Sequence, residues 1–291
     1  MSIPRAGNNL PNGSFIPVIY SKKLLAKFYA GSVCDKICNT DWQGEITGQG
    51  MSVVIRQRPD LTVTPSTQDG KVQWGDIVDT SQTLSIDYAY DGAYKLGNID
   101  MHAFDINLHP EIIDEIANRL RIVVESTVLG SAYSSASNKI AAADFTSWST
   151  TGSCLKTLAK AQAILARNNA PVSGRFAVIS PEMEQSLLQE VGMYAMNSGD
   201  KEGAMQRGFV RNLFGFDIYQ SNLIPGAGSS TVPYQAIAGH ISAITLATKF
   251  TQFDLIAQLQ EFYGAGIRAQ SAFGFRVIKP ELLVNIEGYV S

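Results

Sequence analysis

The sequence predicts an α+β fold, and three observations lead to this class. Residues 110–129 place apolar side chains at helical spacing over a long segment with clear ends. Residues 46–90 hold short runs of β-branched residues separated by turn residues, a pattern typical of antiparallel hairpins. Beyond residue 140, helices and short strands follow one another in mixed order. A chain of 291 residues is long enough for one large domain or two modest ones.

The composition excludes several classes of function. The chain carries 23 basic and 26 acidic residues, which gives a net charge of −3. No basic tail is present, so the sequence excludes strong nucleic-acid binding through a polybasic arm. Charged residues make up 17% of the chain, against about 25% in an average protein. Uncharged polar residues fill this difference, which favours extensive contact with other proteins.

Targeting signals and disulfides are not indicated. Residues 1–9 contain one arginine and no apolar run, so they do not form a secretory signal. No segment approaches the roughly 20 apolar residues of a membrane-spanning helix. Three cysteines are too few, and odd in number, for a disulfide framework. We expect a soluble protein from a reducing compartment, without membrane partners.

The N-terminal part predicts an arm and a short helix. Residues 1–15 are rich in proline, glycine and asparagine, and such a segment needs a partner surface to become ordered. Pro17 stands at a plausible helix start, and an apolar stripe follows until Gly31.

Residues 46–90 form the unusual part of the chain. The pair Asp69–Gly70 predicts a hairpin turn, because a type I′ turn needs positive φ at both central positions, and Asp91–Gly92 repeats the pair. A two-stranded ribbon with few apolar residues is marginal alone in water. The ribbon therefore folds back onto its own domain or lies on a neighbouring molecule, and we favour the second arrangement. The predicted contact residues are Leu61, Val63, Val72, Trp74 and Ile77.

The long helix has clear start and stop signals. Pro110 occupies the first position and Glu111 the first turn, where negative charge suits the helix dipole. Gly130 marks the expected end, so the helix is about 30 Å long at ~1.5 Å per residue. Residues 131–138 are rich in serine and alanine and form the best candidate for a domain boundary.

The second half predicts two helices and several strands. Helices are expected over 153–169 and from Pro181 to about Val191, with a strand at 175–179 between them. Residues 192–208 are expected to form a loop. Further strands are predicted at 216–219, 236–237, 243–247, 253–259, 273–278 and 282–286.

A search for reactive groups yields no active site. Cys34 and Cys38 lie four apart on a predicted helix, too far for a disulfide, and no set of Cys or His has zinc-site spacing. Cys154 reads as a buried residue near a helix start. The segment 264–266 imitates a dinucleotide fingerprint but lies among strands, so we interpret it as a tight turn. The acidic residues between 87 and 105 match no calcium-loop spacing.

Several segments, taken in order, resemble the major capsid proteins of tailed bacteriophages with the Hong Kong 97-type (HK97-like) phage capsid fold. The first two are IPVIYSKKLL at 16–25 and WQGEITGQG at 42–50, running into VVIRQ at 53–57. The others are TLSID at 83–87, GFDIYQSNLIP at 215–225, AGH at 238–240 with AIT at 243–245, YGA at 263–265 and RVIKPE at 276–281. Together they cover the chain from about Ile16 to Glu281.

The resemblance implies a domain plan. It comprises an N-terminal arm at 1–45, an extended β-hairpin loop at 46–90, a peripheral domain at 91–139 with the spine helix 110–129, an axial domain at 140–250, and return strands of the peripheral domain at 251–291. The arm and the hairpin loop would reach across neighbouring subunits.

The resemblance also implies a function. It is that of a major capsid protein that self-assembles through pentamers and hexamers into an icosahedral shell. The shell would enclose double-stranded phage DNA without sequence-specific binding. A separate scaffolding protein and a portal are implied partners, and the protein would be assembled in the host cytoplasm and end in the virion capsid. We expect no enzyme activity, catalytic residue, cofactor or metal. The alternative is a cytosolic α+β enzyme or ligand-binding protein whose site lies in residues 192–208.

Overall fold

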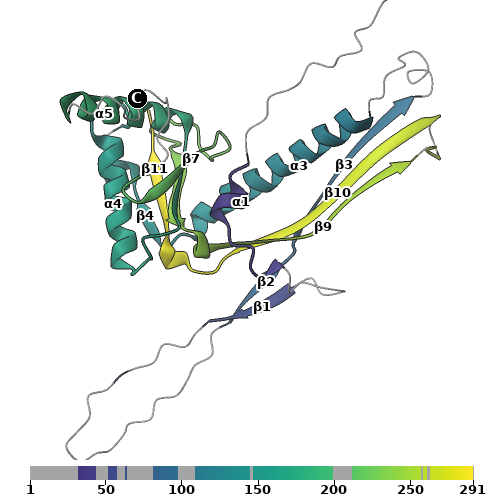
Figure 1. Cartoon of the computed structure of the whole chain (residues 1–291), viewed down its shortest axis with the longest axis horizontal. Coiled ribbons are helices and arrows are strands. Elements are labelled where there is room, and N and C mark those ends of the chain that lie inside the picture. Colours follow the sequence, from purple (N-terminus) through teal and green to yellow (C-terminus); the bar gives the residue numbers. More distant parts are fainter. Residues whose placement is uncertain are drawn as a thin grey trace, which may run out of the picture.

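The computed structural model of the chain contains two β-sheets and a separate two-stranded ribbon (Figure 1). The description covers residues 32–43, 52–57, 63, 81–97, 109–144, 147–198, 212–256, 258–260 and 263–290. One sheet, with its helices, forms a compact domain, and the other extends away from it as a long arm (Figure 1).

The compact domain is built on a six-stranded sheet with the order β4-β11-β8-β5-β7-β6. Two of its pairings, β11 with β4 and β5 with β7, are parallel, and the others are antiparallel. The strands are β4 (Asn138–Ile140), β5 (Arg175–Ile179), β6 (Asn212–Leu213), β7 (Phe216–Gln220), β8 (Tyr234–His240) and β11 (Leu283–Gly288).

Two helices complete this compact domain. These are α4 (Ser153–Arg167) and α5 (Pro181–Ser198), which lie beside the sheet and contact each other. All five residues of the central strand β5 are buried, because the strand has a neighbour on each side and is covered on both faces. The main hydrophobic core of the chain lies largely here, with Phe176, Leu158 and Leu187 among its fully buried side chains.

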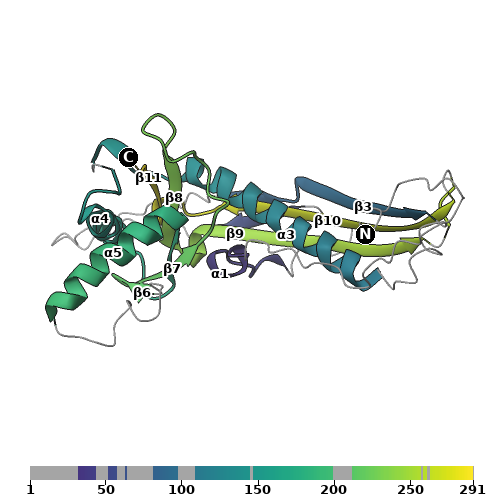
Figure 2. The ribbon, with the colours of Figure 1, turned by 90° about the horizontal axis from the view of Figure 1, so that it is seen from above.

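The arm is a three-stranded antiparallel sheet with a long helix along it. The sheet has the order β3-β10-β9, from β3 (Tyr88–Gly97), β10 (Gly264–Val277) and β9 (Ile244–Ile256). Figures 1 and 2 both show α3 (His109–Ala132) running along these strands.

The helix and the sheet of the arm share a small core. Its buried members are Ile116 and Leu120 of α3 with Ile267 and Ala269 of β10. The helix packs closely on β3, since a Cβ atom at Gly92 would lie 2.8 Å from Cγ2 of Ile116. A glycine is therefore required at this position of the strand.

The ribbon consists of β1 (Ser52–Arg56) and β2 (Ser81–Ser85), which pair antiparallel. Its base packs on its own chain: Ile55 and Leu84 are buried with Ala247 and Ile278. The part of the ribbon nearest the sheets is thus held within the molecule.

Several predicted elements are confirmed. Strand β5 has the predicted bounds, and α4 begins at the predicted Ser153. The long helix is present, but it does not end at Gly130. It continues to Ala132 because Leu129 and Ala132 are fully buried, and this packing outweighs the low helix propensity of glycine.

Two predicted turns are wrong. Asp91–Gly92 lies in the middle of β3, and residues 264–266 form the start of β10. The two strands pair with each other across ten residue pairs, so non-local pairing overrides the local turn preference. The two runs predicted at 243–247 and 253–259 join into one long strand, β9.

The loop predicted at 192–208 is wrong in its first part, since α5 continues to Ser198. Its remainder, the helix expected after Pro17 and the turn at Asp69–Gly70 lie outside the described residues.

The expected domain boundaries also need correction. Residues 88–90 of the expected hairpin loop belong to β3 of the arm, and residues 283–288 of the expected return strands form β11 of the six-stranded sheet. Strand β9 crosses the expected boundary at residue 250. The reason is pairing: β11 lies between β4 and β8 in one sheet, whereas β9 belongs to the other.

Candidate functional site

The reactive side chains of the described residues are buried or dispersed. No group of three or more His, Cys, Asp or Glu among them is arranged to hold a metal ion. Within the same residues, no helix is long and apolar enough to cross a membrane.

The three cysteines are buried free thiols, as predicted. The hydrogen bond with Cys38, and then burial, raise the pKa of Cys34 far above its usual range. Burial, and then the nearby carboxylate of Glu190, raise the pKa of the Cys154 thiol as well. The thiolate is the reactive form of cysteine, so Cys34 and Cys154 are poor nucleophiles.

His240, at the end of β8, serves the fold. Its Nδ1 accepts a hydrogen bond from the Ser242 backbone N–H at 3.1 Å, so Nε2 carries the proton and donates to the Ser173 carbonyl at 3.0 Å. Burial lowers the pKa of the ring, and the positive charges of Lys279 and Arg175 act in the same direction. The histidine therefore links two loops in its neutral form.

The acidic residues considered for a calcium or carboxylate site are separated. Asp87 accepts a hydrogen bond from the Ser85 hydroxyl at 2.6 Å. Asp91 of β3 lines a shallow depression of ≈ 400 Å³. Asp254 lines the same depression and pairs with Arg268 at 3.0 Å. Asp100 and Asp105 lie outside the described residues.

A buried carboxylate joins the arm to the compact domain and to the segment before α1. Glu125 of α3 is 1% exposed. Its Oε2 accepts a hydrogen bond from the Val33 backbone N–H at 2.9 Å, and its Oε1 accepts one from the Ser221 hydroxyl at 2.6 Å. Val33 precedes the short helix α1 (Cys34–Ile37), and Ser221 follows β7. The carboxylate thus ties the helix of the arm to the segment before α1 and to the six-stranded sheet.

Sequence reasoning missed this junction. A signal was present, because Glu125 is the only charged residue between 122 and 132 and follows directly on apolar Val123 and Val124. A single acidic residue in an apolar helical stretch indicates a buried, hydrogen-bonded carboxylate.

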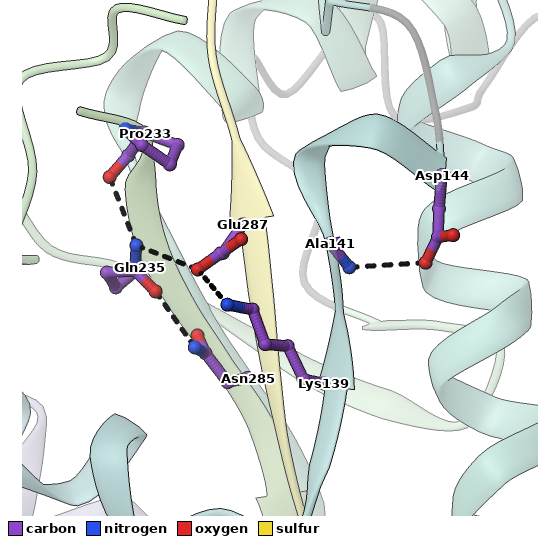
Figure 3. Close-up of polar contacts among 7 residues, drawn as sticks. All are labelled: Lys139, Ala141, Asp144, Pro233, Gln235, Asn285 and Glu287. Atoms are coloured by element: carbon purple, nitrogen blue, oxygen red, sulfur yellow. Dashed lines mark hydrogen bonds and ion pairs between the residues drawn. The ribbon is translucent and has the colours of Figure 1, made fainter. Parts of the chain in front are cut away.

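A polar cluster crosses the edge of the six-stranded sheet (Figure 3). Glu287 of β11 pairs with Lys139 of β4 at 2.6 Å and accepts a hydrogen bond from Gln235 of β8 at 3.4 Å. The Gln235 side chain also accepts from Asn285 at 2.8 Å and donates to the Pro233 carbonyl at 3.4 Å. The cluster fixes the start of β8 and the loop before it.

Most of the predicted contact residues lie outside the residues that the structure describes. Val63 is described and is 92% exposed. Leu61, Val72, Trp74 and Ile77 lie outside the described residues. The base of the ribbon packs on its own chain, so the expectation that the whole ribbon rests on a neighbour is wrong for its base. For the predicted contact residues, contact with a neighbouring copy stays a prediction.

Exposed apolar side chains are distributed over both parts of the molecule. Tyr94 belongs to β3 of the arm, and Tyr263 belongs to the segment before β10. Val172, Phe214, Val232 and Val290 belong to the compact domain. Apolar side chains exposed singly are normal on a protein surface, and only those that lie together at one place indicate a contact.

Comparison with known proteins identifies the family of the chain. A profile of a family described as phage capsid protein matches residues 99–285. None of the curated protein sequences matches the chain.

The fold is similar to that of solved phage structures. A structure titled Mycobacterium phage Che8 has a TM-score of 0.77 and 22% identity, with 94% of this chain and 97% of that chain covered. The capsid structure of the cyanophage P-SCSP1u has a TM-score of 0.76 and 15% identity, with 97% of each chain covered. The mature capsid of bacteriophage PhiM1 has a TM-score of 0.71 and 12% identity, again with 97% of each chain covered.

Proposed function

The chain belongs to the phage capsid protein family and is a subunit of a capsid shell, and from this premise we propose how its shape builds the shell. Copies associate head-to-tail through non-identical surfaces into pentamers and hexamers. These rings then close an icosahedral shell around double-stranded phage DNA. Head-to-tail contacts close into rings when the rotation between neighbours allows it.

The observation that carries the proposal is the division of the molecule into a compact domain and a thin arm. Part of the arm has its own buried cluster of four described residues, whereas the main cluster, which also includes residues of α3, β9 and β10, holds most of the remaining buried apolar residues. A thin, extended element exposes much surface for its volume and gains stability when neighbours cover it. We assign the compact domain to the axial position, around the ring centre, and the arm to the periphery.

The proposed partners follow from the family and from the net charge. A net charge of −3 suits a container, because a strongly cationic wall would hold packaged DNA through its phosphates. We propose that a separate scaffolding protein and a portal take part in assembly in the host cytoplasm. The remaining predicted contact residues, Leu61, Val63, Val72, Trp74 and Ile77, are proposed to lie against a neighbouring copy.

The alternative of a cytosolic enzyme or ligand-binding protein has no support in the described residues. Residues 192–198 of its expected site region are helical, and the buried thiols of Cys34 and Cys154 are poor nucleophiles. The proposal is that of a structural protein.

Electron microscopy of the protein, co-expressed with its neighbouring genes, tests this function. We expect closed shells from the wild type. Deletion of residues 60–80 removes the proposed contacts and leaves the base of the ribbon, so we expect soluble subunits without shells. The fluorescence of Trp74 should also shift when the wild type assembles. Shells of normal size from the deletion variant would contradict the proposed role of these residues, and absence of particles from the wild type would contradict the function.

A further inference from the structure

We propose that two uncharged apolar loop tips, at opposite ends of the six-stranded sheet, are the two halves of one contact between neighbouring copies of this chain. Val172 and Phe214 form the first, here called the turn patch. Val232 and Val290 form the second, here called the loop patch. The proposal rests on the proposed function and deepens it, because head-to-tail association needs two different surfaces on each copy.

The turn patch is formed by two adjacent turns. Val172 lies in the turn before β5 and is 72% exposed, and Phe214 lies in the turn between β6 and β7 and is 37% exposed. The turns are close neighbours, since a Cβ atom at Gly215 would lie 3.8 Å from Cγ1 of Val172. The exposed side chains of Val172 and Phe214 therefore belong to two turns that lie next to each other.

The backbone at Phe214 is strained. Its φ is +53° and that of Gly215 is +76°, so both central residues of the hairpin turn are left-handed. This conformation suits glycine or asparagine and is costly for a bulky aromatic residue. Strained residues with exposed side chains are typical of binding surfaces, where the side chain has a purpose outside its own turn.

The turn before β5 is held rigidly. The buried guanidinium of Arg175 donates to the carbonyls of Pro171 and Ala170, both at 2.7 Å. His240 Nε2 donates to the Ser173 carbonyl at 3.0 Å. A tip fixed in this way loses little conformational entropy on binding, which favours affinity.

The loop patch is equally rigid. Val232 is 52% exposed, and its carbonyl accepts hydrogen bonds from the backbone N–H groups of Ala227 and Ser229. Val290 is 37% exposed, and its N–H donates to the Gly228 carbonyl at 3.1 Å, so the C-terminal segment is tied to the same loop.

Side chains at the start of β8 hold the loop before this strand in place. Gln235 donates to the Pro233 carbonyl within the polar cluster of Figure 3. The loop lies so close to the start of β8 that a Cβ atom at Gly228 would come 2.3 Å from the Tyr234 ring. Glycine is required there, and the tip is held in place from both sides.

The strand register places the two patches at opposite ends of the sheet. Arg175 is paired with His240, and Phe176 with Asp217, so the starts of β5 and β7 lie at the end where β8 finishes. Tyr234 is paired with Gly288, so the start of β8 and the finish of β11 lie at the other end. If the turn patches of two copies met across a two-fold axis, both loop patches would stay uncovered. In a ring, by contrast, the turn patch of each copy can contact the loop patch of the next.

The chemistry of the two patches is complementary. The segments 170–174, 212–215 and 226–234, which display the patches, contain no charged residue. Interface centres are depleted of charge because desolvating a charge is costly. A second copy is the occupant, because the chain is a shell subunit and each copy offers both surfaces.

Engineered cysteines test the contact in assembled particles. The native cysteines are buried in the described structure, so a new surface pair can be read separately. In the double variant V172C/V232C, mild oxidation should give a ladder of covalent oligomers up to five and six copies. Each single variant should give no covalent oligomers, since the thiol introduced by V172C in one copy would face the unchanged Val232 of the next. A second pair, S173C/S230C, guards against unsuitable disulfide geometry at the first.

The outcomes separate this proposal from the proposed function. Dimers from either single variant, or no ladder from either pair in particles of normal shape, would overturn the contact while leaving the shell function intact. Wild-type protein that forms no particles would overturn the function itself.

Charge substitutions give an independent readout. V172D and V232D should each reduce the particle yield at least tenfold and leave the far-ultraviolet circular dichroism of the subunit unchanged. A163D adds the same charge at an exposed position within α4 and should assemble like the wild type. Normal yields from both patch variants would overturn the proposal.

Discussion

The compact domain and the arm of this protein differ in how they bury apolar side chains within one chain. The compact domain surrounds a strand, β5, whose five residues are all buried between neighbouring strands and beneath helices. The arm has a single helix along a three-stranded sheet, and apart from the residues that join the main cluster, four described apolar residues form a separate buried cluster between them. The first region is stabilised within one chain, and the second keeps long surfaces available for other copies.

This difference explains how one chain can be both a folded subunit and a component of a shell. A subunit needs one region that folds alone, so that assembly starts from a defined shape. It also needs thin regions whose surfaces are completed on assembly. Glu125 lies where the two regions meet and holds them in one orientation.

The strongest expected effect comes from removing a core side chain of the compact domain. Phe176 is 1% exposed, and Phe176→Ala should lower the free energy of unfolding by about 3–5 kcal/mol, through lost burial and a new cavity. The matched change in the arm is Ile116→Ala, which should cost about 2 kcal/mol because Ile116, at 8% exposed, borders a small core. Urea unfolding of the subunits measures both. Equal losses would remove the distinction between the regions.

Next in size is the junction between the regions. Glu125→Ala leaves the Val33 N–H and the Ser221 hydroxyl without their acceptor and should cost about 2–4 kcal/mol. Limited proteolysis should then cut within residues 32–43 before it cuts β5. Ser221→Ala removes the hydroxyl that donates to Glu125 and accepts from the Leu223 N–H, but it leaves the Val33 contact of Glu125 in place, and it should cost less, about 1–2 kcal/mol. If proteolysis of residues 32–43 is unchanged in Glu125→Ala, the carboxylate does not join the regions.

A pH-dependent effect is expected from His240 of the compact domain. Burial, the largest cause, lowers its pKa below the ordinary value, so the folded state favours the neutral ring. Between the lowered pKa and about 6.5, the unfolded chain binds a proton that the folded chain does not. The stabilisation is therefore complete above about pH 6.5 and is lost as the pH falls through the folded-state pKa.

The histidine effect is measured as a difference between variants. In His240→Gln, the free energy of unfolding should depend less steeply on pH than in the wild type as the pH falls below about 6.5. The carboxylates contribute equally to both proteins, and their titration cancels. Identical slopes would show that His240 is not held neutral.

The smallest effect is expected on the surface of the arm. Arg119 pairs with Glu115 one helical turn away, at 2.9 Å, and its side chain is 61% exposed. Arg119→Ala should change the free energy of unfolding by about 0.5 kcal/mol or less, because solvent and salt screen such pairs. A loss above about 1 kcal/mol would indicate that the arm depends on its surface charges.

The same contrast decides what could be predicted from the sequence. Local signals were sufficient for α4, β5 and the start of the long helix, where caps and periodicity agree with the final packing. The arm depends on pairing between β3 and β10, whose partners lie far apart in the chain, as Gly97 and Gly264 do. Asp91–Gly92 has the local preference of a turn, and nothing in its neighbourhood reveals the partner strand.

The surfaces were harder to predict than the core. Cys34, Cys38 and Cys154 were recognised as packing residues because burial is the usual state of free cysteine. Val172 and Val232 give no sequence signal, since a single valine in a loop is ordinary until the fold places it at a rigid tip. The resemblance to phage capsid proteins supplied the function that local chemistry could not.

Hydrogen–deuterium exchange, compared between the free subunit and assembled particles, tests most directly whether neighbours complete the arm. We expect amides of β5 to exchange equally slowly in both states. Amides of β3 and the residues around Val63 should slow at least tenfold on assembly. Equal exchange of these segments in the two states would contradict the claim that neighbouring copies cover the arm and the ribbon.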